Sequence, residues 1–245
     1  MSKKAIIIGA SSGIGRSLAY ILDKEGYELG LVARRENLLE ELGSELIHNT
    51  YILPLDISKH TTAINSIKNL INEMGGIDLF ILAAGVGKIN ESLDFSLAKN
   101  VIDINVSGFV ACANTAIKYF INKGSGHFVG ISSLGAYFRA HDVPTYMASK
   151  AFVSSYMGSL RKKVRKELGR NSKVYVTDIK PGFVKTRLVT LNNINPPLMV
   201  STDKAAKSIY RVIKKKKKSA FVPRRWAFFG FVFKHAPEFF WTLIP

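Results

Sequence analysis

The residues best suited to chemistry in this chain are Tyr146 and Lys150, which lie four positions apart in the segment 145–151. On a helix, residues at i and i+4 share one face, so the phenol and the ammonium can enter the same site. A free tyrosine is a poor acid or base at neutral pH because its pKa is about 10. A nearby cation favours the phenolate and lowers this pKa toward the working range. Ser133, thirteen residues before the tyrosine, can supply a second hydroxyl to hold a carbonyl oxygen.

A glycine-rich segment near the N-terminus provides the setting for this pair. An apolar, β-branched run predicts a buried parallel strand near 5–9, and Gly9, Gly13 and Gly15 follow before a helix expected near 14–25. Such a strand, turn and helix N-terminus favour an anion, because free backbone N–H groups and the helix dipole point at the turn. The spacing G-x-x-x-G-x-G differs from the commoner G-x-G-x-x-G, so an ordinary strand-to-helix loop remains the alternative.

Strand-like and helix-like segments alternate along the chain, which predicts an α/β fold: a doubly wound, Rossmann-like parallel sheet with helices on both faces. We expect strands near 5–9, 28–33, 50–54, 77–82, 126–131, 173–179 and 219–222. Helices are expected near 14–25, 35–47, 59–73, 97–122, 145–168 and 202–215. We expect residues 1–222 to form this domain and residues 223–245 to form a basic, aromatic C-terminal extension.

The second expected strand ends in Ala33, Arg34 and Arg35. A fold that binds NAD usually carries an acidic residue here, which holds the ribose 2′-hydroxyl. This chain has guanidinium groups instead, and these favour a 2′-phosphate through charge-assisted hydrogen bonds. We therefore expect NADP(H) as the cofactor, with Arg34 as the first choice for the phosphate contact. The alternative is a solvated arginine that opens the following helix.

These features resemble the short-chain dehydrogenase/reductase family, in its single-domain subgroup with a TGxxxGxG loop and a YxxxK pair. The resemblance covers residues 4 to 222. The matching positions are Gly9, Gly13 and Gly15 in the cofactor loop, Asp56, Ala83, Ala84 and Gly85 after later strands, Asn105, Ser133, Tyr146 and Lys150 in the catalytic set, and Pro181, Gly182, Val184 and Thr186 in the Pro-Gly segment. Leu82 and Ala83 depart from the family pattern, because they replace the two asparagines of its Asn-Asn-Ala-Gly segment.

The resemblance implies an oxidoreductase that uses NADP(H) to interconvert a carbonyl and an alcohol on a largely apolar small molecule. Tyr146 is then the general acid or base, and Ser133 holds the substrate oxygen. Lys150 lowers the tyrosine pKa and holds the nicotinamide ribose, and Asn105 holds a water that links Lys150 to solvent. The cofactor-binding residues that we expect are Gly9, Ser11, Ser12, Gly13, Ile14, Gly15, Arg34, Arg35, Asp56, Ile57, Ala83, Ala84, Gly85, Tyr146, Lys150, Pro181, Gly182, Val184 and Thr186.

Length, cysteine count, histidine spacing and net charge limit the compartment, the metal content and the partners that we expect for the protein. A chain of 245 residues can form one α/β domain with a full core. The single cysteine, Cys112, has no internal partner, and the chain lacks an export signal, so we expect a cytoplasmic protein. The five histidines are scattered, so we expect no metal site.

The net charge of +17 suits an anionic membrane surface or an anionic ligand, and it is also compatible with an ordinary basic surface. Nucleic acid is disfavoured as a partner, because no sequence motif for reading nucleic acid accompanies the charge.

The C-terminal extension follows a five-lysine run at 214–218 and contains both tryptophans of the chain. Charged and proline residues interrupt it, so a transmembrane helix is not expected. Three interpretations compete: a segment lying in an anionic membrane interface on the cytoplasmic face, a segment packed on a partner subunit or across the substrate pocket, and a core helix of the same domain. An exposed aromatic patch normally marks an interaction site.

Two further segments are candidates for the walls of a substrate pocket. After the Pro-Gly segment, the apolar residues Leu188, Val189, Leu191, Leu198 and Met199 fit the family's mobile substrate lid. The opposite wall is expected between 137 and 144, at Phe138, Arg139, His141 and Val143. Ordinary packing is the alternative for any one of these residues.

Two other functions compete with the enzyme assignment. A non-catalytic NADP(H)-binding sensor or scaffold, held at a membrane or partner by the extension, would keep the glycine loop but not need the catalytic set. An epimerase or dehydratase would usually carry a longer C-terminal substrate domain and a G-x-x-G-x-x-G loop. Family members are commonly homodimers or homotetramers built on the helices that carry Asn105 and Tyr146, so we expect a homo-oligomer.

Overall fold

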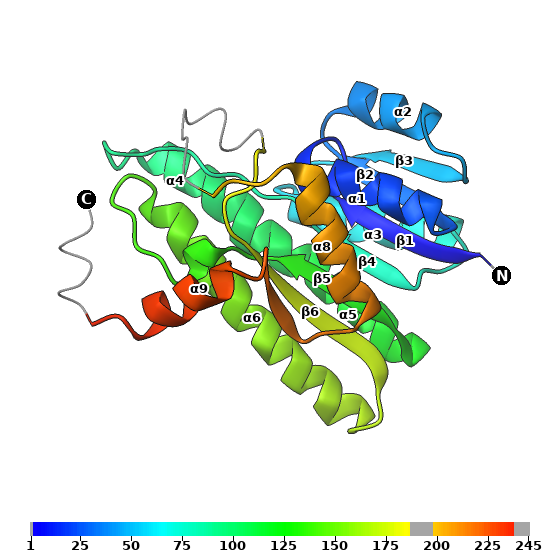
Figure 1. Cartoon of the computed structure of the whole chain (residues 1–245). Helices are drawn as coiled ribbons and strands as arrows, with labels where there is room; N and C mark the ends of the chain where they lie inside the picture. Colours follow the sequence, from blue (N-terminus) through cyan, green and yellow to red (C-terminus); the bar gives the residue numbers. More distant parts are fainter. Residues whose placement is uncertain (1, 187–197, 238–245) are drawn as a thin grey trace.

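The computed structural model describes residues 2–186 and 198–237, and within these ranges seven parallel strands form one sheet (Figure 1). The strands are β1 (Lys3–Ile8), β2 (Tyr27–Ala33), β3 (Thr50–Pro54), β4 (Leu79–Leu82), β5 (Ser125–Ile131), β6 (Lys173–Pro181) and β7 (Ser219–Val222). Their order is β3-β2-β1-β4-β5-β6-β7, so the direction of winding reverses between β1 and β4. Ligands of open α/β sheets bind at this reversal. The predicted Rossmann-like fold is confirmed.

Helices cover both faces of the sheet and enclose two apolar cores. One core packs α1 (Gly13–Lys24), α2 (Glu36–Ser44) and α8 (Thr202–Lys214) against the sheet. The other packs α3 (His60–Glu73), α5 (Phe109–Lys123) and α6 (Pro144–Leu168). The inner strands β1, β2, β4 and β5 are largely buried on both sides, which explains the apolar runs in their sequences. Cys112 of α5 is fully buried in the second core, and burial raises the pKa of its thiol to about 12.

The prediction of a single helix over 97–122 is wrong for the middle of that range. The chain forms α4 (Phe95–Ile102), then one wide π-helical turn, η1 (Asp103–Gly108), and only then α5. The turn contains Asn105, whose side chain bonds the backbone of another loop instead of facing its own helix. Gly108 lets the carbonyl of Ile57 approach, because a Cβ there would lie 2.7 Å from that oxygen. Tertiary contacts therefore widen this turn, as is common at functional sites.

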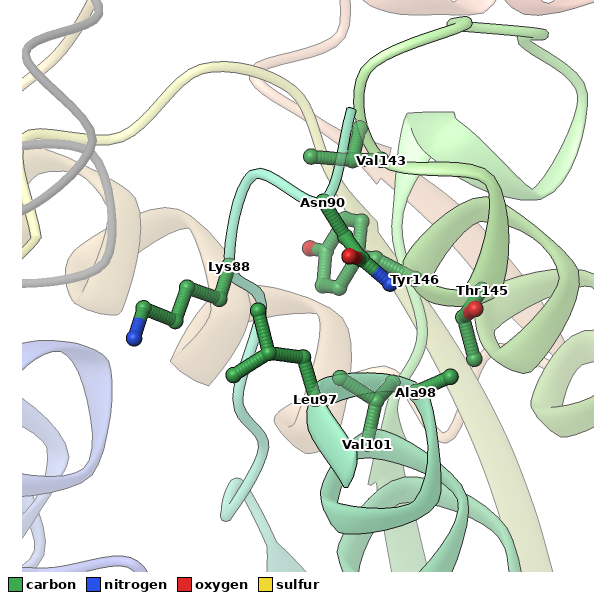
Figure 2. A pocket seen from close by; sticks show the side chains of 8 residues that line it. All are labelled: Lys88, Asn90, Leu97, Ala98, Val101, Val143, Thr145 and Tyr146. Atoms are coloured by element: carbon green, nitrogen blue, oxygen red, sulfur yellow. The ribbon is translucent and has the colours of Figure 1, made fainter. Parts of the chain in front are cut away.

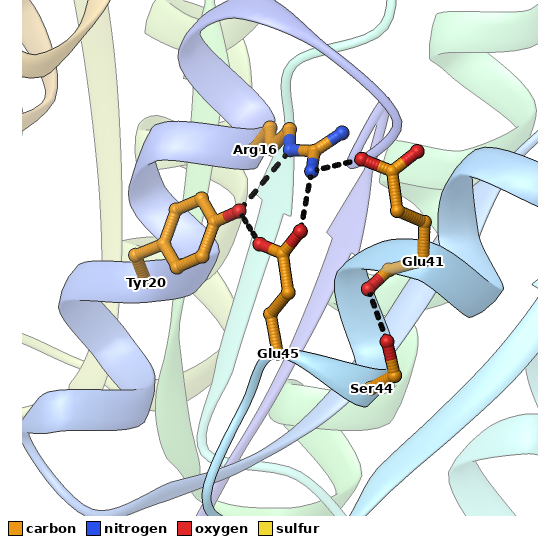
Figure 3. Close-up of polar contacts among 5 residues, drawn as sticks. All are labelled: Arg16, Tyr20, Glu41, Ser44 and Glu45. Atoms are coloured by element: carbon orange, nitrogen blue, oxygen red, sulfur yellow. Dashed lines mark hydrogen bonds and ion pairs between the residues drawn. The ribbon is translucent and has the colours of Figure 1, made fainter.

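A polar cluster joins the C-terminal part of α2 to α1 (Figure 3). The Arg16 guanidinium on α1 donates to Glu41 at 2.7 Å and to Glu45 at 3.2 Å. Tyr20, one turn further along α1, also bonds Glu45. Four side chains, from α1 and from the end of α2, thus share their charges and hydrogen bonds. The end of α2 is therefore fixed to α1.

The C-terminal extension forms a helix, α9 (Trp226–His235), that packs on the domain. Trp226 is 5% exposed and its indole lies against Gly182, where a Cβ would come within 2.3 Å of the ring. Gly230 receives the ring of Phe221 from β7 in the same way. The α9 helix therefore covers the carboxyl edge of the sheet at β6 and β7. Across the two described ranges, no helix is long and apolar enough to cross a bilayer.

A buried charge pair lies between β6 and α6. Asp178 is fully buried and accepts hydrogen bonds from Ser132, Ser154 and the ammonium of Lys180, which is itself 4% exposed. Lys180 also donates to Ser219 at 2.7 Å and stands over the aromatic rings of Tyr137 and Phe221. Because removal of one partner leaves an uncompensated charge in the interior, such a pair is costly to break.

Replacing Asp178 by Ala is expected to lower the free energy of unfolding by about 3–5 kcal/mol, because Lys180 then stays buried without its counter-charge. The double variant Asp178→Leu with Lys180→Met should recover most of that loss. The matched control is Glu167→Ala, which breaks the exposed Lys163–Glu167 pair and should leave stability nearly unchanged. Urea unfolding monitored by circular dichroism measures all of these. Equal losses in Asp178→Ala and Glu167→Ala would contradict the analysis.

Candidate active site

The predicted site residues come together at the carboxyl edge of the sheet. The loops after six of the strands carry them, which is where parallel strands present ligands. Gly9 to Gly15 follow β1, Arg34 and Arg35 follow β2, Asp56 and Ile57 follow β3, Ala83 to Gly85 follow β4, Ser133 follows β5, and Pro181 to Thr186 end and follow β6. Tyr146 and Lys150 lie in the first two turns of α6, and Asn105 lies in the π-helical turn.

The glycine loop is packed so closely that side chains are excluded. A Cβ on Gly9 would lie 2.7 Å from the backbone nitrogen of Ala84, and one on Gly15 would lie 2.2 Å from the carbonyl oxygen of Gly9. Gly13 has a left-handed φ of +60° and faces Thr186, whose methyl carbon would be 3.5 Å from an added Cβ. The loop after β1 is thereby brought against the loops after β4 and β6. Because these glycines have no side chains, a ligand can approach the backbone of the loop directly.

The start of α1 is suited to an anion. Ser12 is the N-cap but makes no side-chain cap bond, and the first turn carries no acidic residue. Instead, the Arg35 guanidinium donates to the hydroxyls of Ser11 and Ser12, each at 2.8 Å. A helix N-terminus and a guanidinium therefore converge on one loop, and both favour phosphate oxygens.

The two arginines after β2 lie in different surroundings. Arg35 lies against the glycine loop, whereas Arg34, the first choice from the sequence, is exposed on the side of Asp56. Burial opposes ionisation of Asp56, but hydrogen bonds from Ser58 and the nearby Arg34 charge hold the pKa of that carboxyl below its usual value. Asp56 therefore stays ionised at neutral pH.

The Ser133 hydroxyl lies close enough to the Tyr146 phenol to influence its protonation. Ser133 is the N-cap of the short helix η2 (Leu134–Ala136), and its oxygen accepts the backbone N–H of Gly135 at 2.9 Å. This bond fixes the serine rotamer. The Tyr146 side chain is only partly exposed, and its desolvation raises the pKa of the phenol, while the hydrogen bond with Ser133 acts in the opposite direction.

Lys150 lies beneath Tyr146, with its ammonium 5.7 Å from the centre of the tyrosine ring. The ammonium donates to the carbonyl oxygen of Ile131 at 3.2 Å. Burial lowers the pKa of Lys150 to about 8, although the charge of Asp178 opposes the shift. The group thus changes charge just above neutral pH.

The expectation that Lys150 brings the tyrosine pKa down is not met in this structure. Desolvation dominates both groups, so it raises the pKa of Tyr146 and lowers that of Lys150. Only Ser133 acts to lower the tyrosine pKa. At neutral pH the site therefore holds a protonated phenol above a largely protonated ammonium.

Asn105 ties three parts of the site together. Its Oδ1 accepts the backbone N–H of Val86 at 2.8 Å, and its Nδ2 donates to the Val86 carbonyl at 2.7 Å and to Ser149 Oγ at 3.0 Å. The loop after β4, the π-helical turn and α6 are joined by one amide. A Cβ on Gly85 would lie 3.1 Å from Lys150 Nζ and 3.3 Å from Asn105 Oδ1, so both groups stand over that glycine.

A narrow pocket, with no room for a water molecule in this structure, lies beside the tyrosine, and Figure 2 shows the Tyr146 ring between Val143 and Leu97. The pocket is lined by Lys88, Asn90, Leu97, Ala98, Val101, Val143, Thr145 and Tyr146. Val143 is the only residue of the predicted wall in this lining. The wall formed by Leu97 and Val101 of α4 was missed, because the sequence alone does not show which face of that helix turns inward.

The other predicted pocket residues have mixed outcomes. Phe138 contacts Phe233 of α9, with ring centres 5.3 Å apart, while Arg139 and His141 are exposed. Leu198 is half exposed. Leu188, Val189 and Leu191 of the predicted lid lie outside the described residues. Ser149, Asp178 and Trp226 were not anticipated as neighbours of the site; for Asp178, an acidic residue inside an apolar strand was the available signal.

The sheet and the Ser-Tyr-Lys arrangement at its carboxyl edge define an α/β protein of the dinucleotide-binding type. The sequence model of the short chain dehydrogenase family matches residues 3–196. An uncharacterized oxidoreductase of Myxococcus xanthus is 35% identical over 208 residues, covering 83% of this chain and 80% of the relative. One from Staphylococcus epidermidis is 30% identical over 186 residues, covering 75% and 79%. The chain therefore belongs to the short-chain dehydrogenase family, a family of oxidoreductases.

Solved structures agree with this fold. A short-chain dehydrogenase from Sphingobium yanoikuyae in complex with NADPH superposes with a TM-score of 0.81 at 21% identity, covering 93% of this chain and 92% of that chain. A 3-ketoacyl-(acyl-carrier-protein) reductase from Brucella melitensis complexed with NADH has a TM-score of 0.79 at 21% identity, covering 91% and 98%. At this identity the likeness concerns the fold alone.

The buried Lys150 should make stability depend on pH. Its folded-state pKa is about 8, below the ordinary value of 10.5, so the folded protein carries a charge penalty below pH 8 that is relieved as the pH rises toward 10. Lys150→Met removes the penalty. Its advantage in unfolding free energy over the wild type should therefore shrink by about 3 kcal/mol across this window. Lys163→Met, on the same helix but exposed, is the control and should show no such trend; parallel curves for Lys150→Met and the wild type would contradict the assignment.

Proposed function

We propose that the protein is an NADP(H)-dependent oxidoreductase that interconverts a carbonyl and an alcohol on a largely apolar small molecule. The observation that carries the proposal is the pair of hydroxyls of Tyr146 and Ser133, set above Lys150 and next to a pocket. The glycine cradle and the uncapped start of α1 fit a dinucleotide pyrophosphate, because side chains are excluded there and backbone N–H groups are available. When bound, the nicotinamide supplies or accepts a hydride.

In the reducing direction, Ser133 hydrogen-bonds the carbonyl oxygen of the substrate as negative charge develops there. Tyr146 then gives its phenolic proton to that oxygen, and the product is the alcohol. The raised pKa of Tyr146 keeps this proton in place at neutral pH, which suits an acid. In the oxidising direction Tyr146 must first lose the proton, so oxidation is favoured at higher pH.

Lys150 and Asn105 would resupply the proton that Tyr146 donates to the substrate. The Lys150 ammonium, with a pKa of about 8, can return a proton to the phenolate and is placed to hold the ribose hydroxyls. Asn105 stands with Lys150 over Gly85, and we assign it to a water that connects the lysine to solvent. The apolar lining from Leu97 and Val101 favours an apolar group beside the carbonyl.

The remaining contacts of the cofactor follow from the positions of the loops. We assign the 2′-phosphate to Arg34 and Arg35, the adenine to Asp56 and Ile57, and the nicotinamide amide to Thr186. Ala83, Ala84 and Gly85 would line the middle of the cofactor. Pro181, Gly182 and Val184 would form the wall behind its nicotinamide. The support is their common place at the carboxyl edge of the sheet.

We further propose that the protein is a cytoplasmic homo-oligomer built on the helices that carry Asn105 and Tyr146. Ile102 and Phe152 on these helices are 40% and 39% exposed, and a hollow next to them is lined by Val106, Pro144 and Ala148. Apolar surface of this kind is suited to a subunit contact.

Tyr146→Phe is expected to lower turnover of a carbonyl substrate by about 10²–10⁴-fold, because it removes the proton donor and little else. NADPH should bind the variant with nearly unchanged affinity. A panel of apolar aldehydes and ketones, followed by NADPH absorbance, measures the rate, and fluorescence titration measures binding. Rates like those of the wild type would contradict the role of Tyr146, and a loss of NADPH binding would point to a structural role instead.

The double variant Arg34→Ala with Arg35→Ala should raise the KM for NADPH by about 10²–10⁴-fold, since each of the two charge-assisted hydrogen bonds contributes about 1.5–3 kcal/mol. The KM for NADH should change little. The single variants divide the effect between the exposed Arg34 and the loop-bound Arg35. A wild-type preference for NADH would remove the NADP(H) assignment while leaving the hydride chemistry intact.

A further inference from the structure

The helix α9 has an inner face that the domain explains. Trp226 and Gly230 are buried, and Phe229 lies 5.2 Å from Trp226 between ring centres. Phe233 reaches Phe138 beside the candidate pocket. These contacts attach the helix to the carboxyl edge of the sheet and leave its opposite side outside the core.

The outer face of α9 carries two large aromatic side chains that the domain does not explain. Phe228 is 70% exposed and Phe231 is 66% exposed. They are three residues apart, so they lie on one face of the helix as neighbours. Two exposed phenylalanines on a helix that already has a full inner contact are typical of a surface that binds something apolar.

Basic residues stand at both ends of this aromatic pair. Arg224 precedes the helix, and Lys234 and His235 close it, each in step with the outer face. Arg225 is occupied with the backbone carbonyl of Leu198. Within α9 and the residues that precede it from 223, the sequence contains no aspartate or glutamate, so the charged side chains of this helix are all basic. An occupant with both apolar and anionic groups would complement this face.

The five-lysine run at 214–218 does not belong to this surface. It precedes β7, whereas α9 follows it, so a strand of four residues separates the two. At about 3.3 Å per residue the strand spans roughly 13 Å, which places the run at the amino edge of the sheet and α9 at the carboxyl edge. The continuous basic and aromatic tail of the sequence is therefore two separate features.

We propose that the outer face of α9 docks on an anionic lipid bilayer. Phe228 and Phe231 would enter the boundary between headgroups and acyl chains, while Arg224 and Lys234 lie on the anionic headgroups. A second copy of this chain fits less well, because a two-fold contact through α9 would place its uniformly basic residues opposite one another. This docking presents the carboxyl edge of the sheet, with the Tyr146 pocket, to the lipid.

The test is co-sedimentation of the full-length chain with phosphatidylcholine vesicles prepared with and without phosphatidylserine. We expect binding to the anionic vesicles only, and about tenfold or greater loss of affinity in the variant Phe228→Ser with Phe231→Ser. The matched control is Phe95→Ser, because Phe95 is 73% exposed but lies on α4. Its affinity should equal that of the wild type. Circular dichroism and thermal unfolding establish that the three proteins are equally folded.

A second double variant and its matched control test whether the basic residues around α9 contribute to vesicle binding. Arg224→Gln with Lys234→Gln should weaken binding and flatten its salt dependence, whereas Lys163→Gln, exposed on α6, should do neither. Vesicle binding that survives the two Phe→Ser changes overturns the proposal. So does an absence of binding by the wild type. If the variant Phe228→Ser with Phe231→Ser sediments at a lower mass than the wild type in the absence of vesicles, the face belongs to a contact with a second copy. If the same variant loses affinity for a single-stranded oligonucleotide as strongly as for vesicles, the face belongs to nucleic acid. None of these measurements depends on turnover, so their failure would be separate from failure of the proposed activity.

Discussion

One side-chain amide holds the site together. Asn105 bonds both backbone groups of Val86 and the hydroxyl of Ser149, so the end of β4, the π-helical turn and α6 cannot move apart without breaking it. The amide is 1% exposed, and its loss would leave buried backbone groups unpaired. These hydrogen bonds of Asn105 keep Lys150 and Gly85 in their positions. The wide turn in η1 is the conformation that lets Asn105 reach across.

Burial, more than pairing of charges, sets the protonation of the site. The interior that shapes the pocket also desolvates Tyr146 and Lys150, and it drives each toward its neutral form. Asp178 opposes this for Lys150 and is itself held by Lys180, Ser132 and Ser154. The fold thus supports a proton donor above a lysine that is ready to change charge, and a buried ion pair next to them that resists the change.

Local sequence was sufficient for most of the fold, whereas the roles of the site residues, which lie together at the carboxyl edge of the sheet, stay predictions. Apolar runs and glycine turns act through neighbouring residues, so the strands and the glycine loop were predictable. The break at Asn105 was not, because its partner Val86 lies far away in sequence. For the same reason Arg34 was preferred to Arg35, whose contacts with Ser11 and Ser12 arise only when two loops meet. The helix α9 has aromatic residues on both faces, so no periodic pattern indicated which face is buried.

The seclusion of Cys112 has a practical consequence. Its sulfur lies within the core and its thiol is almost never ionised at neutral pH, so alkylating probes find no reactive site in the native protein. Because the sequence contains this one cysteine alone, a cysteine engineered anywhere on the surface would be the sole target of a spin label or fluorophore. The chain is thus ready for single-site spectroscopy without prior removal of its native thiol.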